Sequence, residues 1–595
     1  MQAFVERLPH GIPVNISSDP RHGASAAGEE YKSGGGQTSS WPEGLGMAAT
    51  FDPALCREFA GIIRKEYRAL GIATALSPQV DVGSEPRWMR IEDTFGAHPG
   101  LVADMGRAYC DGLQSDPEQN GNWGGGSVAA MAKHWPGGGP CEAGRDAHYA
   151  FGKFAVHPGG CAEEHLKPFM DGVFKLDGPT GKTASIMPYY TVTWNMDPSG
   201  GNVGNSYSRL IIQDMLREQA GYDGVVCTDW GITGDPDPEM DSFGSRCFGV
   251  EELSEAERHL RILENGVDQF GGNNNVVPIL EAYEIGCQRY GEEAMGARFR
   301  RSAARLLTNT FRCGLFENPY LNTAESQRIV GCEEHCQAGF EAQLKSIVMI
   351  KNTGTLPIRE RKKVYVPDRH VEPRKSFFRT MLPAQDLPGA SKAAVEKYFD
   401  WAETPKDADL AIVFIESPLS DGYSKETGYR PVTLQYCPYT ADTAREHSIG
   451  QGDFREADHP DRSYCGKSNT PANAHDLDVV LNTRAAMGDK PVIVVVRMHN
   501  PCVLSELEAA ADAILVDFGV QQEALLAIIS SQAEPSGLLP VQLPRDMETV
   551  EAHCEDKPLD LEPYVDGCGN AYDFGFGLNW NGPIRDGRID RYLKP

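Results

Sequence analysis

Short apolar runs alternate with amphipathic stretches through the first half of the chain. Apolar residues recur at helical spacing from Phe51 to Leu70, and Gly71 follows at the place where a helix usually ends. The next residues, Ile72 to Leu76, are continuously apolar or small, which is typical of a strand buried on both faces. This stretch therefore predicts a helix that leads directly into a parallel strand.

The same unit of strand, polar loop and helix recurs along this half. Strands are predicted at 11–18, 72–76, 128–134, 184–190, 224–229 and 267–272, and helices at 51–70, 163–174, 207–220 and 254–265. Consecutive units of this kind favour an α/β fold of the (β/α)8 TIM-barrel type. Only about six strands are clear, so either two strands are irregular or the barrel is incomplete at its N-terminal start.

A second α/β region follows a break near residues 311–324, where Gly314, Pro319 and Asn322 indicate a linker. Short Val/Ile-rich runs at 347–351, 364–367, 410–415, 491–498 and 513–518 predict an open, mostly parallel sheet between helices, an α/β sandwich. A polar insertion, 417–473, interrupts it, and loops of this length are usually functional or disordered. The expected organisation is a barrel at 1–315, a linker at 316–342, the sandwich at 343–560 and a C-terminal tail at 561–595.

The acidic balance narrows the classes of partner. The formal net charge of −28 argues against nucleic acid and anionic membranes. No apolar window is long enough to cross a bilayer, and residues 1–9 lack the apolar core of a signal peptide. The 15 cysteines show no CxxC pair or zinc-like spacing, so we expect reduced core residues and no metal site. A reducing, cytoplasmic location is favoured, with export open if a leader was removed.

One strand end carries a candidate for chemistry. The strand at 224–229 stops at Asp229, and Trp230 follows it. The carboxyl ends of barrel strands form the active-site face, so a carboxylate there is a catalytic candidate and the indole is a surface on which a ligand can stack. The alternative is an aspartate that only caps a helix or a turn.

Several motifs along the chain, including the one at Asp229, occur in an order that resembles glycoside hydrolase family 3. The motifs are Asp19 after a Gly-Ile-Pro strand, Pro86-Arg87-Trp88-Met89-Arg90-Ile91-Glu92, Lys133-His134-Trp135-Pro136-Gly137, Met187-Pro188-Tyr189-Tyr190, Val226-Cys227-Thr228-Asp229-Trp230, Ser346 to Asn352 with Leu356-Pro357, and Phe574-Gly575-Phe576-Gly577-Leu578. Together they cover nearly the whole chain.

The resemblance implies a retaining, exo-acting β-glycosidase that needs no cofactor, most often a β-glucosidase or a β-xylosidase, with a small carbohydrate as its substrate. Asp229 matches the nucleophile, and Trp230 matches an aromatic wall. The positions that match residues holding the non-reducing sugar are Asp19, Arg90, Lys133, His134 and Tyr190. Glu92 matches a glutamate behind the arginine.

The chemistry of retention agrees with these roles. It needs two carboxyl groups about 5 to 5.5 Å apart, one ionised to attack the anomeric carbon and one protonated to assist the leaving group. Lys133 can donate to sugar hydroxyls, and Arg90 can fork onto two hydroxyls or orient a carboxylate such as Asp19. The alternatives are surface ion pairs for Arg90 and Lys133 and a structural capping role for His134.

The acid/base is expected in a loop of the second domain, as the resemblance implies. Glu426, in Lys425-Glu426-Thr427-Gly428-Tyr429, fits the spacing from the strand at 410–415 best, and Glu416 at the end of that strand is the runner-up. Tyrosines in the insertion could form walls for the leaving group, or could simply pack the loop.

The chain also departs from the family pattern. The turn after His134 reads Pro136-Gly137-Gly138-Gly139-Pro140 and lacks the histidine that many members carry, while His148 lies farther along, which weakens an N-acetylhexosaminidase interpretation. Only ten residues precede Gly11, where members usually have several tens. A β-xylosidase, an α-arabinosidase, a phosphorylase and a catalytically inactive sugar-binding relative remain as alternatives.

Overall fold

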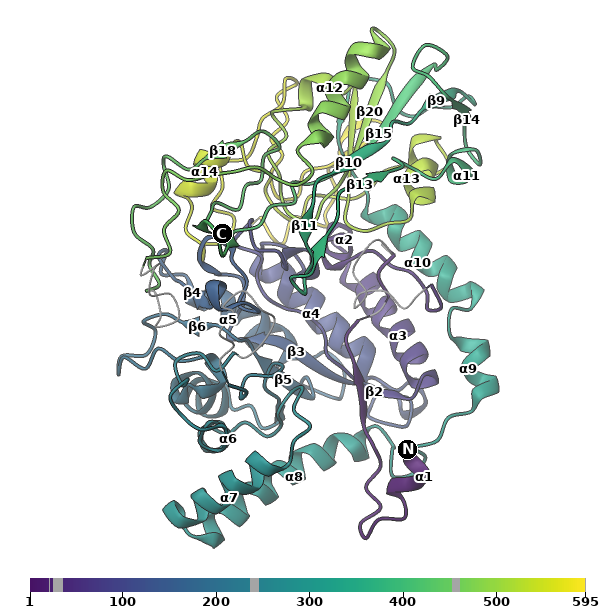
Figure 1. Ribbon diagram of the computed structural model, residues 1–595. Helices are drawn as coiled ribbons and strands as arrows, with labels where there is room; N and C mark the ends of the chain where they lie inside the picture. Colours follow the sequence, from purple (N-terminus) through teal and green to yellow (C-terminus); the bar gives the residue numbers. More distant parts are fainter. Residues whose placement is uncertain (21, 25–35, 236–245, 452–460, 594–595) are drawn as a thin grey trace.

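The computed structural model describes residues 1–20, 22–24, 36–235, 246–451 and 461–593. It has two α/β regions, with the first half of the chain below and the second half above in the view of Figure 1. None of the helices in these ranges has the length and apolar content that crossing a bilayer requires.

A parallel sheet forms the centre of the first region. Its strands, in spatial order, are β1 (Ile16–Ser18), β2 (Ile72–Ala75), β3 (Ala129–Trp135), β5 (Ser185–Pro188) and β7 (Val225–Val226). Each neighbouring pair is parallel. The sixth predicted strand is reduced to one bridge, between Cys227 and Gln269. The barrel-like sheet predicted from the sequence is confirmed, and its last strands are shorter than their apolar runs suggest.

The predicted helix before β2 is confirmed as α3 (Pro53–Ala69). Asp52 caps its N-terminus by accepting hydrogen bonds from the next backbone N–H groups, and Pro53 occupies the first turn, where a missing N–H costs nothing. Its apolar face packs on α4 (Pro99–Gln114). The outer layer also contains α5 (Ala162–Lys167), which continues as the π-helical η5 (Pro168–Val173), and η7 (Leu210–Gln219), α6 (Glu255–Glu264), α7 (Val277–Tyr290) and α8 (Glu292–Arg312).

Two helices lead to the second region, α9 (Thr323–Ile329) and α10 (Glu333–Ser346), along the right of Figure 1. The sheet that follows has the order β14-β9-β15-β20-β21-β8-β22-β23. Its strands are β14 (Asp400–Ala402), β9 (Lys363–Tyr365), β15 (Leu410–Glu416), β20 (Val492–Arg497), β21 (Ala513–Asp517), β8 (Val348–Asn352), β22 (Leu578–Asn579) and β23 (Gly582–Pro583). The first five are parallel and the last three antiparallel to their neighbours, as a mostly parallel sheet requires.

Alternate residues of these strands enter two separate cores. Val413 and Val494 pack in one core with residues of α12 (His475–Met487). Ile412 and Ile493 point the other way, into a core that contains residues of α13 (Gln522–Ile529). A parallel sheet covered on both faces needs apolar residues at every position, which explains the continuous Val/Ile runs and confirms the α/β sandwich.

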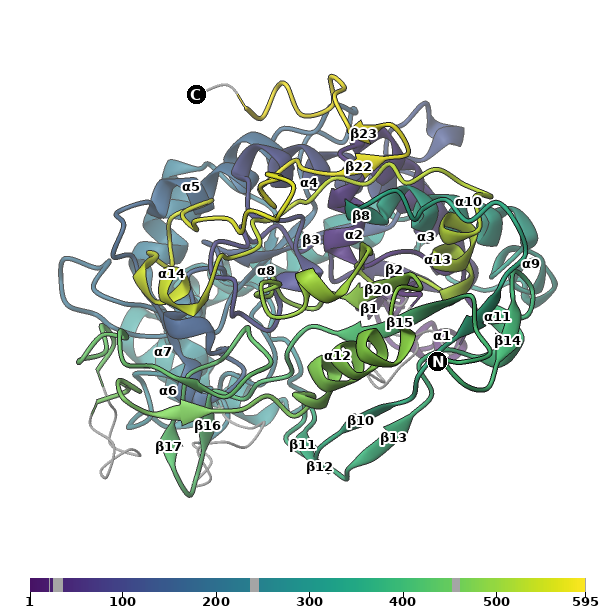
Figure 2. The ribbon, with the colours of Figure 1, turned by 90° about the horizontal axis from the view of Figure 1, so that it is seen from above.

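The polar insertion at 417–473 contains short hairpins, although its residues 452–460 lie outside the described part of the chain. One hairpin joins β16 (Tyr423–Ser424) to β17 (Gly428–Tyr429). A second hairpin, which precedes the insertion, joins β11 (Arg374–Lys375) to β12 (Met381–Leu382). Both project from the same side of the molecule when it is seen from above (Figure 2).

Polar contacts dock the second region on the first. Arg497, at the end of β20, pairs with Glu92, and His499 Nδ1 lies 3.3 Å from the same carboxylate. The Asn500 side chain donates to the backbone carbonyls of Pro86 and Trp88, both at 2.8 Å. Glu92, which the resemblance places behind Arg90, therefore ties the two regions together.

Candidate active site

Asp229 follows the buried strand β7 and is itself 6% exposed. Its Oδ1 accepts a hydrogen bond from the backbone N–H of Trp230 at 2.8 Å. In the described part of the chain no donor satisfies its Oδ2, and His134 Nε2 stands 3.8 Å from that oxygen. Buried polar atoms are normally hydrogen-bonded, so an unsatisfied carboxylate oxygen at a strand end is suited to meet a bound molecule.

His134 lies on β3 in a fixed tautomer. Its Nδ1 is 2.7 Å from Asp81 Oδ2, and its Nε2 is 3.1 Å from Arg90 Nη1. An arginine can only donate, so Nε2 is the acceptor and Nδ1 carries the proton that Asp81 accepts. Burial and the Arg90 charge lower the pKa of His134 well below its usual value. The imidazole beside Asp229 is therefore neutral at pH 7.

Asp81 also accepts hydrogen bonds from the backbone N–H groups of His134 (3.1 Å) and Gly138 (2.6 Å). Burial raises the pKa of Asp81 to about 6, against the opposing effect of these donors. The glycine-rich turn is thus built around this carboxylate: a Cβ at Gly138 would lie 3.1 Å from its Oδ1.

Two cations sit beside this histidine. Lys133 is 7% exposed and donates to Asp19 Oδ1 at 3.0 Å. Arg90 donates through NH2 to Gln79 Oε1 at 2.7 Å as well as to His134. A pocket of about 110 Å³ is lined by Asp19, Gln79, Arg90 and Lys133 among its walls. The burial of Lys133 excludes the alternative of a simple surface ion pair for this residue.

Tyr190 and Trp230 close another side of the site. The Tyr190 hydroxyl accepts the Trp230 backbone N–H at 3.1 Å, and burial together with the Asp229 charge raises the pKa of Tyr190 well above its usual value. Arg246 lies over the Tyr190 ring at 4.6 Å and donates to the Trp230 carbonyl at 3.0 Å. A Cβ at Gly271 would lie 2.6 Å from the Trp230 ring, so glycine is needed there to admit the indole.

The two acid/base candidates differ sharply in their surroundings. Glu416 ends β15 and is bonded to Arg369 (2.7 Å) and to His499 (3.3 Å). Burial alone would raise the pKa of Glu416, but the His499 hydrogen bond and the Arg369 charge outweigh it and hold the pKa well below its usual value. A carboxyl group kept ionised in this way is unsuited to donate a proton.

Glu426 is exposed, in the turn between β16 and β17. It lines a cleft of about 760 Å³ between the two regions, together with Asp146 of the first region and Phe377 of the β11–β12 hairpin. The structure therefore gathers seven of the predicted residues into one connected group on the first region: Asp19, Arg90, Lys133, His134, Tyr190, Asp229 and Trp230. Glu426 lines the neighbouring cleft between the two regions, which none of these seven residues lines.

Several residues of the site were not predicted as such. Asp81, Gln79 and Arg246 hold predicted residues in place, as described above. Asp146 is 2% exposed and accepts from the Tyr189 hydroxyl (2.7 Å) and from His148 Nδ1 (2.6 Å). The His148 ring lies 4.8 Å from that of Tyr190. The only sequence signal for these residues was their place in polar loops after predicted strands, which is shared by many residues without a role.

Groups of three or more histidine, cysteine, aspartate or glutamate side chains placed to hold a metal ion do not occur within the described ranges.

Comparisons with known proteins agree on one family. The profile described as "Glycosyl hydrolase family 3 N terminal domain" matches residues 1–269, and that of the "Glycosyl hydrolase family 3 C-terminal domain" matches residues 347–580. Beta-glucosidase C of Emericella nidulans is 34% identical over 580 residues, covering 96% of this chain and 79% of the relative. The periplasmic beta-glucosidase/beta-xylosidase of Dickeya chrysanthemi is 31% identical over 592 residues, covering 97% and 79%.

Solved structures show the same architecture. A mutant beta-glucosidase from Listeria innocua, in complex with laminaribiose, superposes with a TM-score of 0.67. The match covers 97% of this chain and 73% of that one at 17% sequence identity, which bears on the fold alone.

Proposed function

The chain belongs to glycoside hydrolase family 3, and we propose that it is a retaining, exo-acting β-glucosidase that releases terminal non-reducing β-D-glucosyl residues. The observation that carries the proposal is the arrangement at the end of β7. There a buried carboxylate oxygen of Asp229, for which the described residues offer no donor, faces a neutral His134, with Lys133, Arg90 and Asp19 alongside.

Asp229 acts as the nucleophile in the first step. Its Oδ2 attacks the anomeric carbon, the glycosidic bond breaks, and the leaving oxygen receives a proton from the acid/base carboxyl. In the second step the acid/base, now a carboxylate, removes a proton from water. The water oxygen then replaces Asp229 on the anomeric carbon. Two inversions leave the configuration retained, and no cofactor takes part.

The surrounding side chains hold the sugar. Lys133 and Arg90 supply donors to hydroxyl groups, and Asp19 accepts from them. A pocket of about 110 Å³ adjoins these three residues, but Asp229 and Trp230 do not line it, so its volume does not measure the sugar site. The proposal of an exo-acting enzyme with a soluble carbohydrate as its partner rests on the family and on its β-glucosidase relatives. Trp230 offers the apolar face on which one side of the sugar ring stacks.

Glu426 is proposed as the acid/base. It is exposed on its turn and lines the cleft, which is where the leaving oxygen of a bound substrate would have to lie. The hairpin that carries it is anchored on the first region, because the Tyr423 ring stacks on Phe151 at 4.8 Å and Arg145 lies over the Tyr429 ring at 4.8 Å. The role requires this turn to bring the carboxyl to about 5 Å from Asp229 over a bound sugar.

The test uses nitrophenyl β-glucoside with the wild type, Asp229→Ala, Glu426→Gln and Glu416→Gln, with and without azide. We expect Asp229→Ala to be inactive without azide, and a glycosyl azide of retained configuration to form only in Glu426→Gln. In Asp229→Ala, azide would attack the anomeric carbon directly and give the inverted product. Rescue of Glu416→Gln in place of Glu426→Gln would move the acid/base to Glu416. Full activity of Asp229→Ala would overturn the proposal.

β-Xylosidase activity is the second candidate, because the Dickeya relative is named for both activities. The same assay with nitrophenyl β-xyloside measures it. A higher kcat/KM on the xyloside than on the glucoside would replace β-glucosidase as the main activity, while leaving the two carboxylates in their roles.

A further inference from the structure

The cleft that Glu426 lines begins beside the hydrolytic site around Asp229. Met89, which precedes Arg90 in the chain, lines it, and so does Asp146 from the loop after the glycine-rich turn. Other parts of its lining come from the β11–β12 and β16–β17 hairpins, which project from the same side of the molecule (Figure 2). With Glu426 as the acid/base, the leaving group of a glucoside lies in this cleft, so the lining determines which leaving groups fit.

Basic side chains of the second region line this cleft. They are Arg374 and Lys375 on β11, Arg379 in the turn of the same hairpin, and Arg430 directly after β17. Arg379 pairs with Asp421 at 3.1 Å, whereas no hydrogen bond or ion pair joins the side chain of Arg374 or Arg430 to any residue in the described ranges. The Nε of Arg430 is buried without an acceptor there. Buried N–H groups are normally hydrogen-bonded, so this guanidinium is suited to meet an acceptor that a ligand supplies.

Most carboxylates around the cleft are held by other basic groups. Five of them have such a partner: Glu92 with Arg497, Asp146 with His148, Glu372 with His475, Glu416 with Arg369 and Asp421 with Arg379. The other two acidic residues of the lining are Glu43, on the first region, and Glu426 itself. The positive charges of Arg374 and Arg430 therefore remain available to a bound molecule, in a chain whose net charge is −28.

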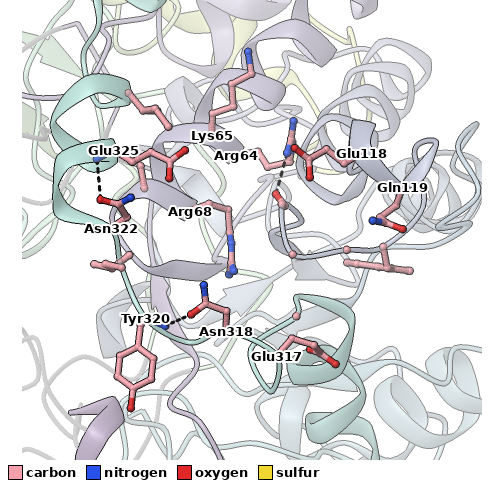
Figure 3. Close-up of a pocket in the computed structure, with 18 of the residues that line it drawn as sticks. Arg64, Lys65, Arg68, Glu118, Gln119, Glu317, Asn318, Tyr320, Asn322 and Glu325 are labelled. Atoms are coloured by element: carbon pink, nitrogen blue, oxygen red, sulfur yellow. Dashed lines mark hydrogen bonds between the residues drawn. The ribbon is translucent and has the colours of Figure 1, made fainter.

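The basic residues of the other large cavity are placed differently. That cavity has a volume of about 950 Å³ and is lined by Arg64 and Arg68 of α3 (Figure 3). Burial lowers the pKa of both groups, and the charge of Asp116 is among the effects that oppose it. Glu118 and Glu317 share the lining, and the two arginines point apart. Carboxylates near that cavity balance its cations, and we assign no ligand to it.

Apolar side chains complete the lining of the cleft beside Glu426. Phe151 and Phe377 contribute rings, and Met89 and Met381 line it while being 38% and 61% exposed. Ligand sites commonly combine an apolar lining with a few polar groups that fix the orientation of the ligand. The planar guanidinium of an arginine matches the two oxygens of a carboxylate. Together these features suit a molecule with an apolar ring and a carboxylate.

We propose that the cleft selects β-glucosides whose leaving group combines an apolar ring with a carboxylate, and that Arg430 binds this carboxylate while Arg374 adds to the attraction. The inference rests on the function proposed above, because the acid/base role of Glu426 places the leaving group here. It makes Arg430 a residue that determines specificity.

Two synthetic substrates test the proposal, 4-(carboxymethyl)phenyl β-glucoside and its neutral amide, 4-(carbamoylmethyl)phenyl β-glucoside. The methylene group insulates the phenol from the substituent, so both leaving groups depart almost equally well. The ratio of the two kcat/KM values therefore measures recognition of the charge. We expect the wild type to prefer the acid by roughly tenfold at low salt, and less as salt screens the attraction.

Arg430→Gln should bring this ratio close to one, and Arg374→Gln should lower it by a smaller factor. Arg430→Lys retains the charge without the planar fork and should keep part of the preference. Both substrates are measured on the same sample, so the ratio does not depend on how much of a variant is folded. Arg359→Gln is the matched control, because Arg359 is an exposed arginine of the second region that does not line the cleft. It should keep the ratio of the wild type.

Equal kcat/KM values of the wild type for the acid and the amide would overturn the inference and leave the proposed function intact. An unchanged ratio in Arg430→Gln, or an equal loss in Arg359→Gln, would also overturn it. Hydrolysis of neither glucoside would instead contradict the proposed function. Calorimetric titration of both glucosides into the wild type then decides, since equal affinity rules out selection of the carboxylate, and tighter binding of the acid that Arg430→Gln abolishes supports it.

Discussion

The two proposed catalytic carboxylates are held in opposite ways. Asp229 lies at the end of a buried strand, next to side chains that are themselves fixed by hydrogen bonds, such as His134 by Asp81. Glu426 lies on an exposed turn, and its hairpin is positioned by aromatic rings that pack across the domain interface. One carboxylate is placed by the backbone of its own sheet, the other by contacts with a different domain.

This difference has a consequence for catalysis. Hydrogen-bonded groups on strand ends are arranged before a substrate arrives, so their alignment costs nothing during the reaction. A carboxyl on a hairpin can adapt to leaving groups of different shape, but its position is only as exact as the packing beneath it. Substitutions that disturb each kind of support should therefore differ in the step that they slow.

The largest effect is expected at Asp81. In Asp81→Asn the acceptor of the His134 Nδ1–H is weakened, so the imidazole is free to turn away from Arg90 and Asp229. We expect kcat/KM to fall on the order of a hundredfold, as misplacement of groups in the site commonly costs. Steady-state kinetics with nitrophenyl β-glucoside measure the kcat/KM of Asp81→Asn and of the wild type.

Asp171→Asn is the control for that substitution, because Asp171 is an exposed aspartate paired with Lys175 at 2.8 Å. It should leave the rate unchanged. A wild-type rate in Asp81→Asn would show that the tautomer of His134 does not need Asp81.

A smaller effect, with a different signature, is expected from Tyr423→Leu. The substitution removes the stack on Phe151 beneath the Glu426 hairpin, and such a stack contributes about 0.5–1.5 kcal/mol beyond its buried area. We expect roughly a tenfold lower kcat for glucosides with poor leaving groups, which need the proton, and little change for those with good ones.

Tyr290→Leu, at an exposed position on α7, is the matched control and should behave as the wild type does. Equal losses of Tyr423→Leu on both classes of leaving group would mean that the stack supports the fold of the site in general, and not the acid/base in particular.

The smallest effect concerns the domain interface and its dependence on pH. Burial alone would lower the pKa of His499, but the charge of Glu92 and the hydrogen bonds to Glu416 and Glu92 outweigh it and raise the pKa to about 9. The folded pKa lies above the ordinary value of about 6.5. The stabilisation is therefore complete below pH 6.5 and is lost as the pH rises through 9.

Melting temperatures between pH 6 and 9.5 measure the stabilisation that protonated His499 contributes. We expect the wild type to lose stability over that interval and His499→Gln to show a flatter profile. The same slope in both proteins would contradict a role for His499.

The sequence predicted the parts of this molecule that follow from local pattern. Continuous Val/Ile runs identified the buried strands of the sandwich, and the spacing before Gly71 identified α3, because burial on two faces or on one dictates these patterns directly. The seven residues predicted for the hydrolytic site on the first region also come together, since motifs at strand ends meet at one edge of a parallel sheet.

What the sequence did not reveal depends on distant contacts. Gln79 and Arg246 are ordinary polar residues until folding brings them to Arg90 and Tyr190. The sequence leaves both Glu426 and Glu416 as acid/base candidates, because the contacts of Glu416 with Arg369 and His499 join residues that are far apart in the chain. Glu426 remains a proposal. The sixth predicted strand, 267–272, is a single bridge at Gln269, and its sequence Val-Asp-Gln-Phe-Gly-Gly has polar residues and glycines where the other strands have apolar runs.

The division of the two proposed catalytic carboxylates between domains makes hydrolysis depend on how the domains are assembled. In the proposed mechanism, Asp229 and Glu426 act together only while Arg497 and Asn500 hold the second domain against the first. Molecules with both domains folded but separated would show the far-UV circular dichroism spectrum of the native protein and no turnover. As denaturant is added in small steps, activity should therefore be lost before any secondary structure. Turnover then measures whether the two domains are still in contact.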